Sequence, residues 1–425
     1  MQKKVLIITY YWPPAGGPGV QRWLKFVKYL PEYGIHPTVY IPENPSYPLL
    51  DTSLIDEIPE NVTIIKQPIK EPYKLAELLS RQSSKTISSG VIPKKKKQSF
   101  VQRLMLYVRG NYFIPDARKA WVTPSVSFLS EYIQRENINT VITTGPPHSL
   151  HLIGLQLKAM IGTQWIADFR DPWTTIGYHK KLKLSVNAAE KHKLMEKQVL
   201  TSADKIIVTS ENTKKEFETK TKQPITVITN GYDNYQLPKV TKDTKFSLAH
   251  IGSLLSERNP RVLWNVLGEL IKEHQNFRQD FVLRLIGVVS DDVLKEIYQF
   301  IPKENIDLVG YVSHKEALIY QRQSQLLLLI EIDSEDTKAI IPGKLFEYMV
   351  AGTPIISVGP KDSDVERIIK STNTGRYFYY EEHSELKEHL FLRFQDFKNS
   401  TLASFPIGLQ QYGRKALTKK LADLI

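Results

Sequence analysis

The strongest constraint on the fold is an alternation of short apolar runs with amphipathic stretches, and this alternation occurs twice. In the first half, runs rich in Val and Ile predict strands, and helical patterns separate several of them. The expected strands are Val5–Thr9, Thr38–Ile41, Val62–Lys66, Val141–Thr144, Trp165–Asp168, Lys205–Val208 and Ile225–Ile228. The expected helices are Gln21–Tyr33, Val126–Glu136, Leu150–Ile161 and Ala188–Ala203. Such alternation is typical of a parallel sheet covered on both faces.

The pattern restarts in the second half, after a polar segment without periodicity, Asn230–Asp243, which suits an interdomain linker. The expected strands here are Phe246–Ile251, Val282–Ile286, Ile306–Val309, Leu326–Ile330 and Pro354–Ser357. The expected helices are Arg261–His274, Asp291–Phe300, Lys315–Gln323, Lys344–Val350, Asp364–Lys370 and the final Gly413–Ile425. We therefore predict an α/β chain with two Rossmann-like domains, residues 1–235 and 236–410, facing one cleft, followed by a C-terminal helix over 411–425.

Composition limits the class of protein. The 425 residues are too many for one compact core. The absence of cysteine excludes disulfides, thiol catalysis and cysteine-ligated metal. No stretch approaches the ~18 apolar residues of a membrane span, and the short run Val5–Thr9 is unlike a signal peptide. We expect a cytoplasmic protein whose contact with a membrane, on the inner face, is peripheral.

The net charge of +12 comes mainly from one segment, Ser80–Trp121, which holds ten basic residues and one acid. Outside it, 47 basic and 44 acidic residues nearly balance. One interpretation is a solvated insertion loop. Another is a patch that binds an anionic membrane surface, and a nucleic-acid patch is disfavoured because no nucleic-acid-binding motif accompanies it. The cations proposed for contact with the membrane or with a substrate are Lys94, Lys95, Lys96, Lys97, Arg103 and Arg109.

Three motifs follow strands of the first half. Gly16 and Gly17 come between the first strand and a helix, where glycine lets the backbone approach a ligand, although a plain tight turn explains them too. His148 precedes a helix together with His151, either satisfied by the backbone or contacting a substrate. Asp168, Arg170 and Asp171 directly follow a strand; they form either a structural ion pair or a catalytic loop that orients or deprotonates an acceptor hydroxyl.

Two motifs follow strands of the second half. Gly252 and Ser253 end a strand, and Arg258 follows with a side chain suited to phosphate. The run Pro342–Pro354 opens a helix with Gly343, Lys344 and Leu345, where a cation opposes the helix dipole unless an anion binds there. Glu347 lies about one turn further, near the same face. A cation and a carboxylate at a helix start suit the diphosphate and the ribose of a nucleotide.

With these motifs the chain resembles, nearly end to end, the GT-B glycosyltransferases of the family-4 type, which include bacterial surface-polysaccharide enzymes. The resemblance depends most on the run Pro342-Gly343-Lys344-Leu345-Phe346-Glu347-Tyr348, with Gly352-Thr353-Pro354 after it. It implies transfer of a sugar from a nucleotide diphosphate-sugar to a hydroxyl, generally with retention and without an essential metal or cofactor. It also implies that the donor binds the second domain, the acceptor the first, and that the last helix crosses back to the first domain. Gly16 and Gly17 are then expected to admit the phosphate-sugar end of the donor when the domains close.

The resemblance assigns Glu347 to the donor ribose, but the first Glu of the family's E-x7-E motif is Ala339 here. Thr337, Lys338 or backbone amides of 340–343 are the candidates to replace it. The family's His-Asp appears as Arg170-Asp171, and His148 or His151 is the candidate to face the sugar. Two other functions remain open: a nucleotide-sugar epimerase of the same fold, and a non-catalytic nucleotide- or membrane-binding module.

Overall fold

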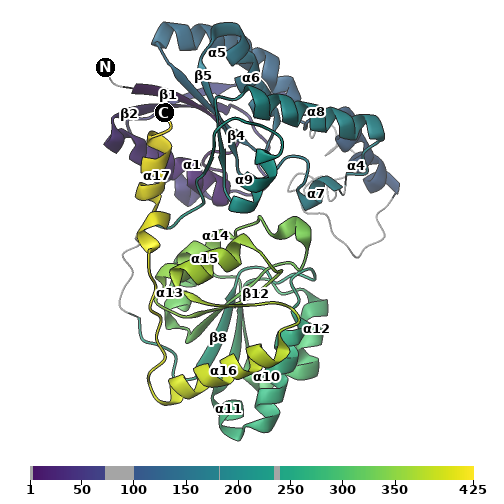
Figure 1. Cartoon of the computed structure of the whole chain (residues 1–425), viewed down its shortest axis with the longest axis vertical. Helices are drawn as coiled ribbons and strands as arrows, with labels where there is room; N and C mark the ends of the chain where they lie inside the picture. The colour runs from purple at the N-terminus through teal and green to yellow at the C-terminus, as the bar shows by residue number, and fades with distance from the viewer. Residues whose placement is uncertain (1–2, 72–99, 181, 234–239) are drawn as a thin grey trace. The chain divides into compact units, whose positions relative to one another are not determined.

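The computed structural model describes residues 3–71, 100–180, 182–233 and 240–425, and it divides the chain into two compact units (Figure 1). Unit 1 comprises Met1–Asn230 and Arg414–Ile425, and unit 2 comprises Gly231–Gly413. Each unit contains one sheet with parallel strands and helices around it. The predicted α/β class with two Rossmann-like domains is therefore confirmed.

The sheet of unit 1 has seven parallel strands in the order β3-β2-β1-β4-β5-β6-β7. The strands are β1 (Lys3–Ile8), β2 (Ile35–Pro42), β3 (Thr63–Gln67), β4 (Thr140–Gly145), β5 (Gln164–Phe169), β6 (Lys205–Val208) and β7 (Ile225–Val227). The helices include α1 (Pro18–Tyr29), α4 (Phe100–Tyr112), α5 (Val122–Glu136), α6 (Ser149–Ile161), α7 (Gly177–Lys180), α8 (Val186–Ser202), α9 (Glu211–Glu218) and α17 (Arg414–Ala422). All seven strands predicted for this half are present, with ends shifted by at most three residues.

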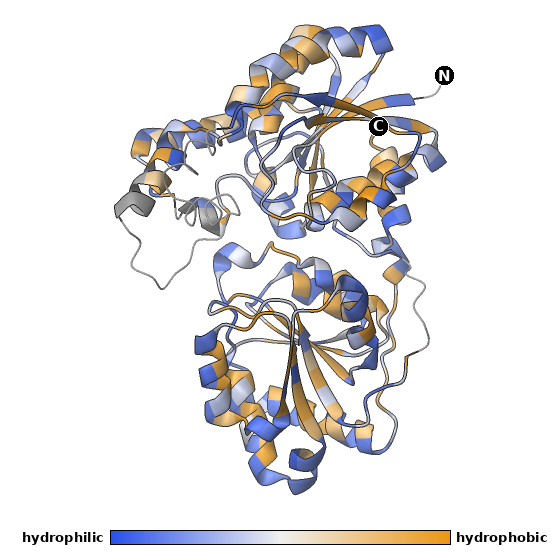
Figure 2. Ribbon diagram, turned by 180° about the vertical axis from the view of Figure 1, so that it is seen from behind, coloured by the Kyte–Doolittle hydropathy of each residue, from blue (hydrophilic) through white to orange (hydrophobic). Residues whose placement is uncertain are grey.

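Strand β1 shows why this sheet is covered on both faces. Successive side chains of a strand point to opposite faces. Val5 and Ile7 accordingly join one buried cluster, while Leu6 and Ile8 join a second one. Figure 2 shows apolar strands inside each unit and polar residues on the outer sides of the helices.

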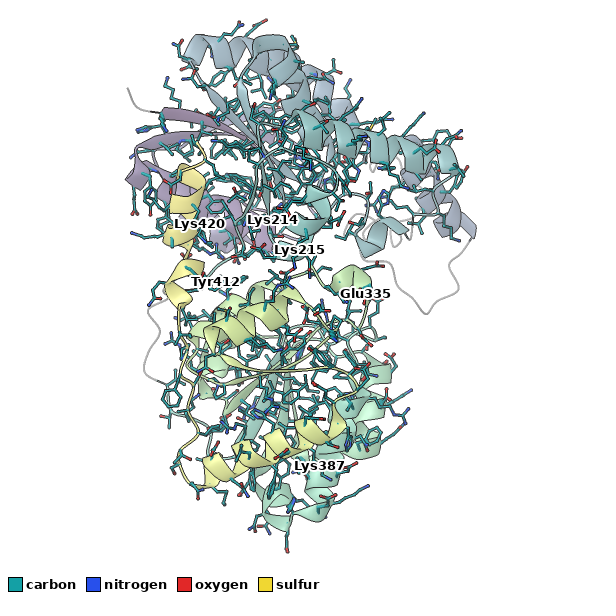
Figure 3. All side chains as sticks on the ribbon, viewed as in Figure 1. Lys214, Lys215, Glu335, Lys387, Tyr412 and Lys420 are labelled. Atoms are coloured by element: carbon teal, nitrogen blue, oxygen red, sulfur yellow. The ribbon has the colours of Figure 1, made fainter. Side chains whose placement is uncertain are left out.

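The last helix, α17, packs within unit 1, as the resemblance implied. Arg414 Nη1 donates a hydrogen bond of 2.8 Å to the carbonyl of Gln21 on α1. Leu417 and Leu421 are buried in the same cluster as Trp23. Just before α17, the chain pairs with the start of unit 2, where the Tyr232 N–H donates to the carbonyl of Tyr412 (labelled in Figure 3).

The sheet of unit 2 has six parallel strands in the order β10-β9-β8-β11-β12-β13. The strands are β8 (Phe246–Ile251), β9 (Phe281–Ile286), β10 (Ile306–Gly310), β11 (Leu326–Ile330), β12 (Ile355–Val358) and β13 (Gly375–Phe378). The helices are α10 (Arg261–Glu273), α11 (Gln275–Asp280), α12 (Asp291–Phe300), α13 (His314–Gln323), α14 (Gly343–Val350), α15 (Asp364–Thr372) and α16 (His383–Lys398). Strand β13 and helices α11 and α16 were not predicted. Lys387 of α16 (Figure 3) donates to Glu269 and Glu273, which ties this helix to α10.

The structure describes the basic segment Ser80–Trp121 only from residue 100 onward. Residues 80–99, with Lys94, Lys95, Lys96 and Lys97, lie outside the described residues, and Arg103 falls within α4. Arg118 is buried in an ion pair of 3.0 Å with Glu71, and Trp121 stacks on Tyr40. The interpretation as one solvated loop is therefore wrong for its C-terminal part, which is a helix followed by a buried turn.

Candidate functional site

In unit 2, the carboxyl ends of β8 and β9 approach each other through two glycines. Gly252 has φ +113° and its N–H donates to the carbonyl of Ile286 at 2.7 Å. A Cβ on Gly287 would lie 2.6 Å from the Gly252 oxygen, so no larger residue fits there. Ser253 follows with an exposed side chain. The strand end predicted to approach a ligand is thus open to solvent on one side.

Lys344 lies in the first turn of α14 and reaches back to the end of β8. Its Nζ donates to the carbonyl of Ile251 at 2.9 Å and lies 3.5 Å from Nε2 of His250. It makes no ion pair with any residue that the structure describes. Burial, followed by the positive charge of Arg258, lowers the pKa of Lys344 to about 7. A partly buried ammonium that forms no ion pair with the described residues indicates an anion-binding position.

Arg258 is the second cation at this edge of the sheet. Its guanidinium is partly exposed and forms no hydrogen bond or ion pair with the described part of the chain. Two neighbouring cations without a counter-ion repel each other, and an anion between them relieves that repulsion. Gly343, the first residue of α14, adds the amino end of an eight-residue helix.

Glu347 presents its carboxylate to two partners from α13. His314 Nε2 lies 2.9 Å from Oε1, and Gln321 Nε2 donates to Oε2 at 3.0 Å. The Glu347 side chain is 21% exposed, so hydroxyl groups of a ligand can reach it. The sequence did not single out His314 and Gln321, since their contact with Glu347 spans 33 and 26 residues.

Leu345 has no free group to offer a ligand. Its side chain is fully buried in a cluster with Phe346 and Tyr348, and its N–H donates to the carbonyl of Pro342 at 3.0 Å. The prediction of Leu345 as a donor contact is therefore corrected to a core residue. The reason is the helical period, which turns position 345 inward while 344 and 347 face outward.

The loop 331–342 before α14 uses its polar side chains internally. Thr337 Oγ1 donates to the carbonyl of Ile332 at 2.7 Å, and Lys338 pairs with Glu335 (Figure 3) at 2.7 Å. The Lys338 carbonyl accepts from the N–H of Asp364 at 2.9 Å. The Ile340 N–H also donates within the loop, to the carbonyl of Thr337 at 2.9 Å, and Pro342 has no N–H. These contacts leave the backbone N–H groups of Ile341 and Gly343 as the simpler replacement for the glutamate that is missing at Ala339.

Glu331 is an acid in this site that the sequence reasoning missed. It directly follows β11, is 4% exposed, and accepts hydrogen bonds from Tyr377 Oη (2.6 Å) and Ser363 Oγ (2.7 Å). Burial raises the pKa of Glu331 to about 7. Tyr380 Oη donates to the Glu331 carbonyl at 2.8 Å. The network fixes the start of the loop that leads to α14. The sequence did contain a signal for Glu331, because it is a charged residue directly after a run that predicts a buried strand.

In unit 1, Asp168 is part of the core. It is completely buried and accepts hydrogen bonds from Arg22 Nη2 (3.0 Å), Trp23 Nε1 (3.0 Å) and Thr144 Oγ1 (2.8 Å). Arg22 also donates to the carbonyl of Thr229 at 2.7 Å. Both carboxylate oxygens are therefore occupied, and this geometry corresponds to the structural alternative that the sequence left open, not to a catalytic acid or base.

Asp171 has a different environment. Its carboxylate is partly exposed and accepts no hydrogen bond from any described residue. Burial raises the pKa of Asp171, although the positive charge of Arg170 partly compensates. A partly buried carboxylate with free acceptor oxygens is chemically able to hold a hydroxyl group or to take up its proton.

His148 sits in an aromatic cluster and is 6% exposed. Its ring stacks on Trp173 at 5.0 Å and 4°, and neither ring nitrogen has a hydrogen-bond partner within the described residues. Burial, followed by the charge of His151, holds the pKa of His148 well below its usual range. His151 is fully buried, lies 2.9 Å from Thr143 Oγ1, and its pKa falls to about 3 through burial. Of the two, His148 keeps more unused hydrogen-bonding capacity.

The glycine loop divides into two parts. The Gly16 N–H donates to the carbonyl of Leu49 at 3.0 Å, and a Cβ there would meet Leu49 and Asp51 at 3.1 Å. Gly16 therefore serves loop packing, the tight-turn alternative. Gly17 has φ +105° and open space at its Cβ position. Only Gly17 of this pair leaves a backbone surface for a ligand.

Among the described residues, no group of three or more His, Asp or Glu side chains is arranged to hold a metal ion. The helices of that part of the chain are also too short or too polar for any of them to cross a membrane.

No protein-family model and no curated protein matches this sequence. Solved structures match it over nearly their whole length. The chain is similar to sucrose-phosphate synthase from Thermosynechococcus elongatus, with 12% identity, a TM-score of 0.61, and coverage of 99% of this chain and 98% of that one. It is also similar to WaaG, a glycosyltransferase involved in lipopolysaccharide biosynthesis, with 13% identity, a TM-score of 0.54, and 99% of each chain.

A third similar structure is described as a UDP-N-acetylglucosamine 2-epimerase from Listeria monocytogenes. It shares 13% identity and has a TM-score of 0.52, covering 99% of this chain and 95% of that one. At such identities the similarity concerns the fold. With two parallel-sheet domains and end-to-end matches to these enzymes, the chain has the GT-B fold.

Proposed function

We propose that the protein is a glycosyltransferase that moves a sugar, with retention, from a nucleotide diphosphate-sugar to a hydroxyl of a glycan or lipid-linked acceptor. The observation that supports it most is the pair of cations Lys344 and Arg258 beside the carboxylate of Glu347. Two cations without a counter-ion match a diphosphate, and a carboxylate matches ribose hydroxyls. Surface-polysaccharide synthesis is the proposed setting, by analogy with the lipopolysaccharide role of the similar WaaG.

In this proposal, Lys344 and Arg258 bind the diphosphate and neutralise the charge that develops as the bond from the sugar C1 to the diphosphate oxygen breaks. Gly343 and Gly252 give close backbone approach. Glu347 exchanges hydrogen bonds with the ribose. No residue is assigned to a metal or cofactor, because the cations are supplied by side chains.

For the acceptor in unit 1, Asp171 orients the hydroxyl whose oxygen forms the new bond to C1, while its proton passes to the departing diphosphate oxygen. His148 offers a neutral ring nitrogen to a sugar hydroxyl. Asp168 and Arg170 hold the loop in which Asp171 lies, through Asp168 in the core and Arg170 on the Pro146 carbonyl. This mechanism predicts that Asp171→Asn lowers kcat by about 10²–10⁴-fold with little change in donor affinity.

The test is transfer itself. A panel of nucleotide diphosphate-sugars is incubated with the protein and with glycan or lipid-linked acceptors, and released nucleoside diphosphate is measured. Acceptor-dependent release that is lost in Lys344→Met and Glu347→Gln supports the proposal. Acceptor-dependent release at wild-type rates in both variants would contradict the site assignment.

A second candidate, a nucleotide-sugar epimerase, is favoured by one observation, the end-to-end similarity to the structure described as an epimerase. It needs no acceptor. Incubation of each donor alone distinguishes the two functions, because an isomerised sugar in the absence of acceptor supports the epimerase and contradicts a pure transferase.

We also propose that the basic segment places the enzyme on an anionic membrane, with Lys94–Lys97, Arg103 and Arg109 as the cations. Each near-surface cation contributes about 1 kcal/mol of attraction to anionic lipid. Co-sedimentation with vesicles containing phosphatidylglycerol is expected to weaken when Lys94–Lys97 are replaced by glutamine. Binding that is indifferent to anionic lipid, or to this replacement, would contradict it.

A further inference from the structure

The guanidinium of Arg170 lies on the first turn of α1. A Cβ on Gly19 would fall 1.7 Å from Nη1 of Arg170, so the guanidinium fits there only because residue 19 is glycine. Arg170 Nη2 donates to the carbonyl of Pro146, in the turn that ends at His148. The side chain is thus fixed between the start of α1 and the turn after β4.

Several donors at this place have no acceptor in the described part of the chain. Arg170 Nε is buried without a hydrogen-bond partner, and Nη1 forms neither a hydrogen bond nor an ion pair. The N–H groups of Gly17 and Gly19 also donate to no described residue. A buried donor in a folded protein is normally paired, so Arg170 Nε indicates a missing acceptor. The partly exposed N–H groups of Gly17 and Gly19, at the start of α1, are available to the same acceptor.

The charges favour an anion at this position. The start of the twelve-residue helix α1 is the positive end of its dipole. Arg22 forms a buried ion pair with Asp168. The positive charges of Arg170 and Arg414 lie close enough to repel the positive charge of Arg22.

An independent second observation comes from His148, at the other end of the turn that Arg170 holds. It is 94% buried, and both of its ring nitrogens lack partners within the described residues. Asp171, with its free carboxylate, is the next residue after Arg170. Groups that can bind a hydroxyl therefore occur on both of the chain segments that the hydrogen bond from Arg170 to Pro146 joins.

We propose that Arg170 and the N–H groups of Gly17 and Gly19 bind an anionic group, a phosphate or a carboxylate, carried by the acceptor next to its reacting hydroxyl. The inference rests on the proposed function, since it names the acceptor class: a sugar phosphate or a uronic acid. The diphosphate of the donor has its own cations in unit 2, Lys344 and Arg258. A planar guanidinium and two backbone donors match the oxygens of either anion.

The experiment measures binding to the full chain by titration calorimetry with glucose 6-phosphate, glucuronate, glucose and a nucleoside diphosphate. The variants are Arg170→Gln and Arg170→Lys, and the control is Arg135→Gln, on the exposed side of α5. We expect one anionic sugar to bind at least tenfold more tightly than glucose. Arg170→Gln should remove that preference, Arg170→Lys should keep part of it, and the control should keep all of it.

Comparing glucose 6-phosphate with glucuronate identifies whether the site prefers a phosphate or a carboxylate. Nucleoside diphosphate binding that survives in Arg170→Gln shows that the variant is folded. Equal binding of glucose and both anionic sugars, or a preference that survives in Arg170→Gln, overturns the inference. Loss of nucleoside diphosphate binding in a folded Arg170→Gln variant also overturns it, because the cluster then serves the donor. Anionic-sugar binding through Arg170 without any nucleoside diphosphate binding would instead contradict the proposed function.

Discussion

Replacing Lys344 by methionine should stabilise the free protein while it destroys the proposed nucleotide site. The partly buried ammonium donates to the carbonyl of Ile251, and the described residues offer it no ion pair. Lowering its pKa from 10.5 to about 7 corresponds to roughly 5 kcal/mol, at about 1.36 kcal/mol per pKa unit. Because the side chain is partly exposed, we expect Lys344→Met to raise the free energy of unfolding by only ~1–3 kcal/mol.

The gain should depend on pH in a defined direction. The unfolded lysine binds its proton below pH 10.5, whereas the folded one binds it only below about pH 7. The destabilisation is therefore complete below pH 7, declines as the pH rises from 7 to 10.5, and vanishes above that. Lys344→Met should stabilise unit 2 strongly at pH 6 and little at pH 10.

The assay is urea unfolding followed by hydrogen exchange at the amides of β8, with Lys295→Met on the exposed side of α12 as the control. In parallel, Lys344→Met should bind nucleoside diphosphates about 10–100-fold more weakly, the loss of a charge-assisted hydrogen bond worth about 1.5–3 kcal/mol. A variant that is destabilised at pH 6, or that binds nucleoside diphosphates like the wild type, would refute this reasoning.

Three further predictions concern single groups. Asp168→Asn should lower the stability of unit 1 by about 3 kcal/mol, because it leaves the buried Arg22 without its counter-ion; normal urea stability with a selective loss of kcat would make Asp168 catalytic instead. Glu347→Gln should weaken nucleoside diphosphate binding about tenfold in calorimetry but leave inorganic pyrophosphate binding unchanged, and an equal loss for both would remove its ribose role. The affinity for a nucleoside diphosphate should fall from pH 7 to pH 9, because the free protein loses the Lys344 proton over this range. An affinity that calorimetry finds unchanged between these pH values would exclude a role of the Lys344 charge in binding.

The sequence was sufficient to predict a strand or a helix wherever the pattern of apolar residues within that element is clear. Runs such as Leu326–Ile330 are apolar throughout because a central parallel strand is buried on both faces, and β11 occupies these residues. Strand β13 was missed because Gly375–Phe378 contains an arginine and only four residues. Helix α16 was missed because Phe391, Phe394 and Phe397 spread around it among charged residues, which blurs its apolar face.

The sequence could not distinguish the roles of neighbouring charged residues. Asp168 lies within β5 and Asp171 follows just after its end; Asp168 accepts hydrogen bonds from three donors inside the unit, whereas Asp171 accepts none from the described residues. The difference depends on Arg22 and Trp23, about 145 residues away in sequence. Similarly, the pairing of Arg118 with Glu71, which neutralises part of the basic segment, is a contact that no local pattern encodes.

The central claim, that unit 2 binds a nucleotide diphosphate through Lys344, Arg258 and Glu347, is tested most directly by calorimetry with nucleoside diphosphates and monophosphates. The account predicts one site per chain, tighter binding of a diphosphate than of its monophosphate, and loss of that difference in the double variant Lys344→Met, Arg258→Gln. Diphosphate and monophosphate binding of equal strength, or a difference that persists in the double variant, would contradict it.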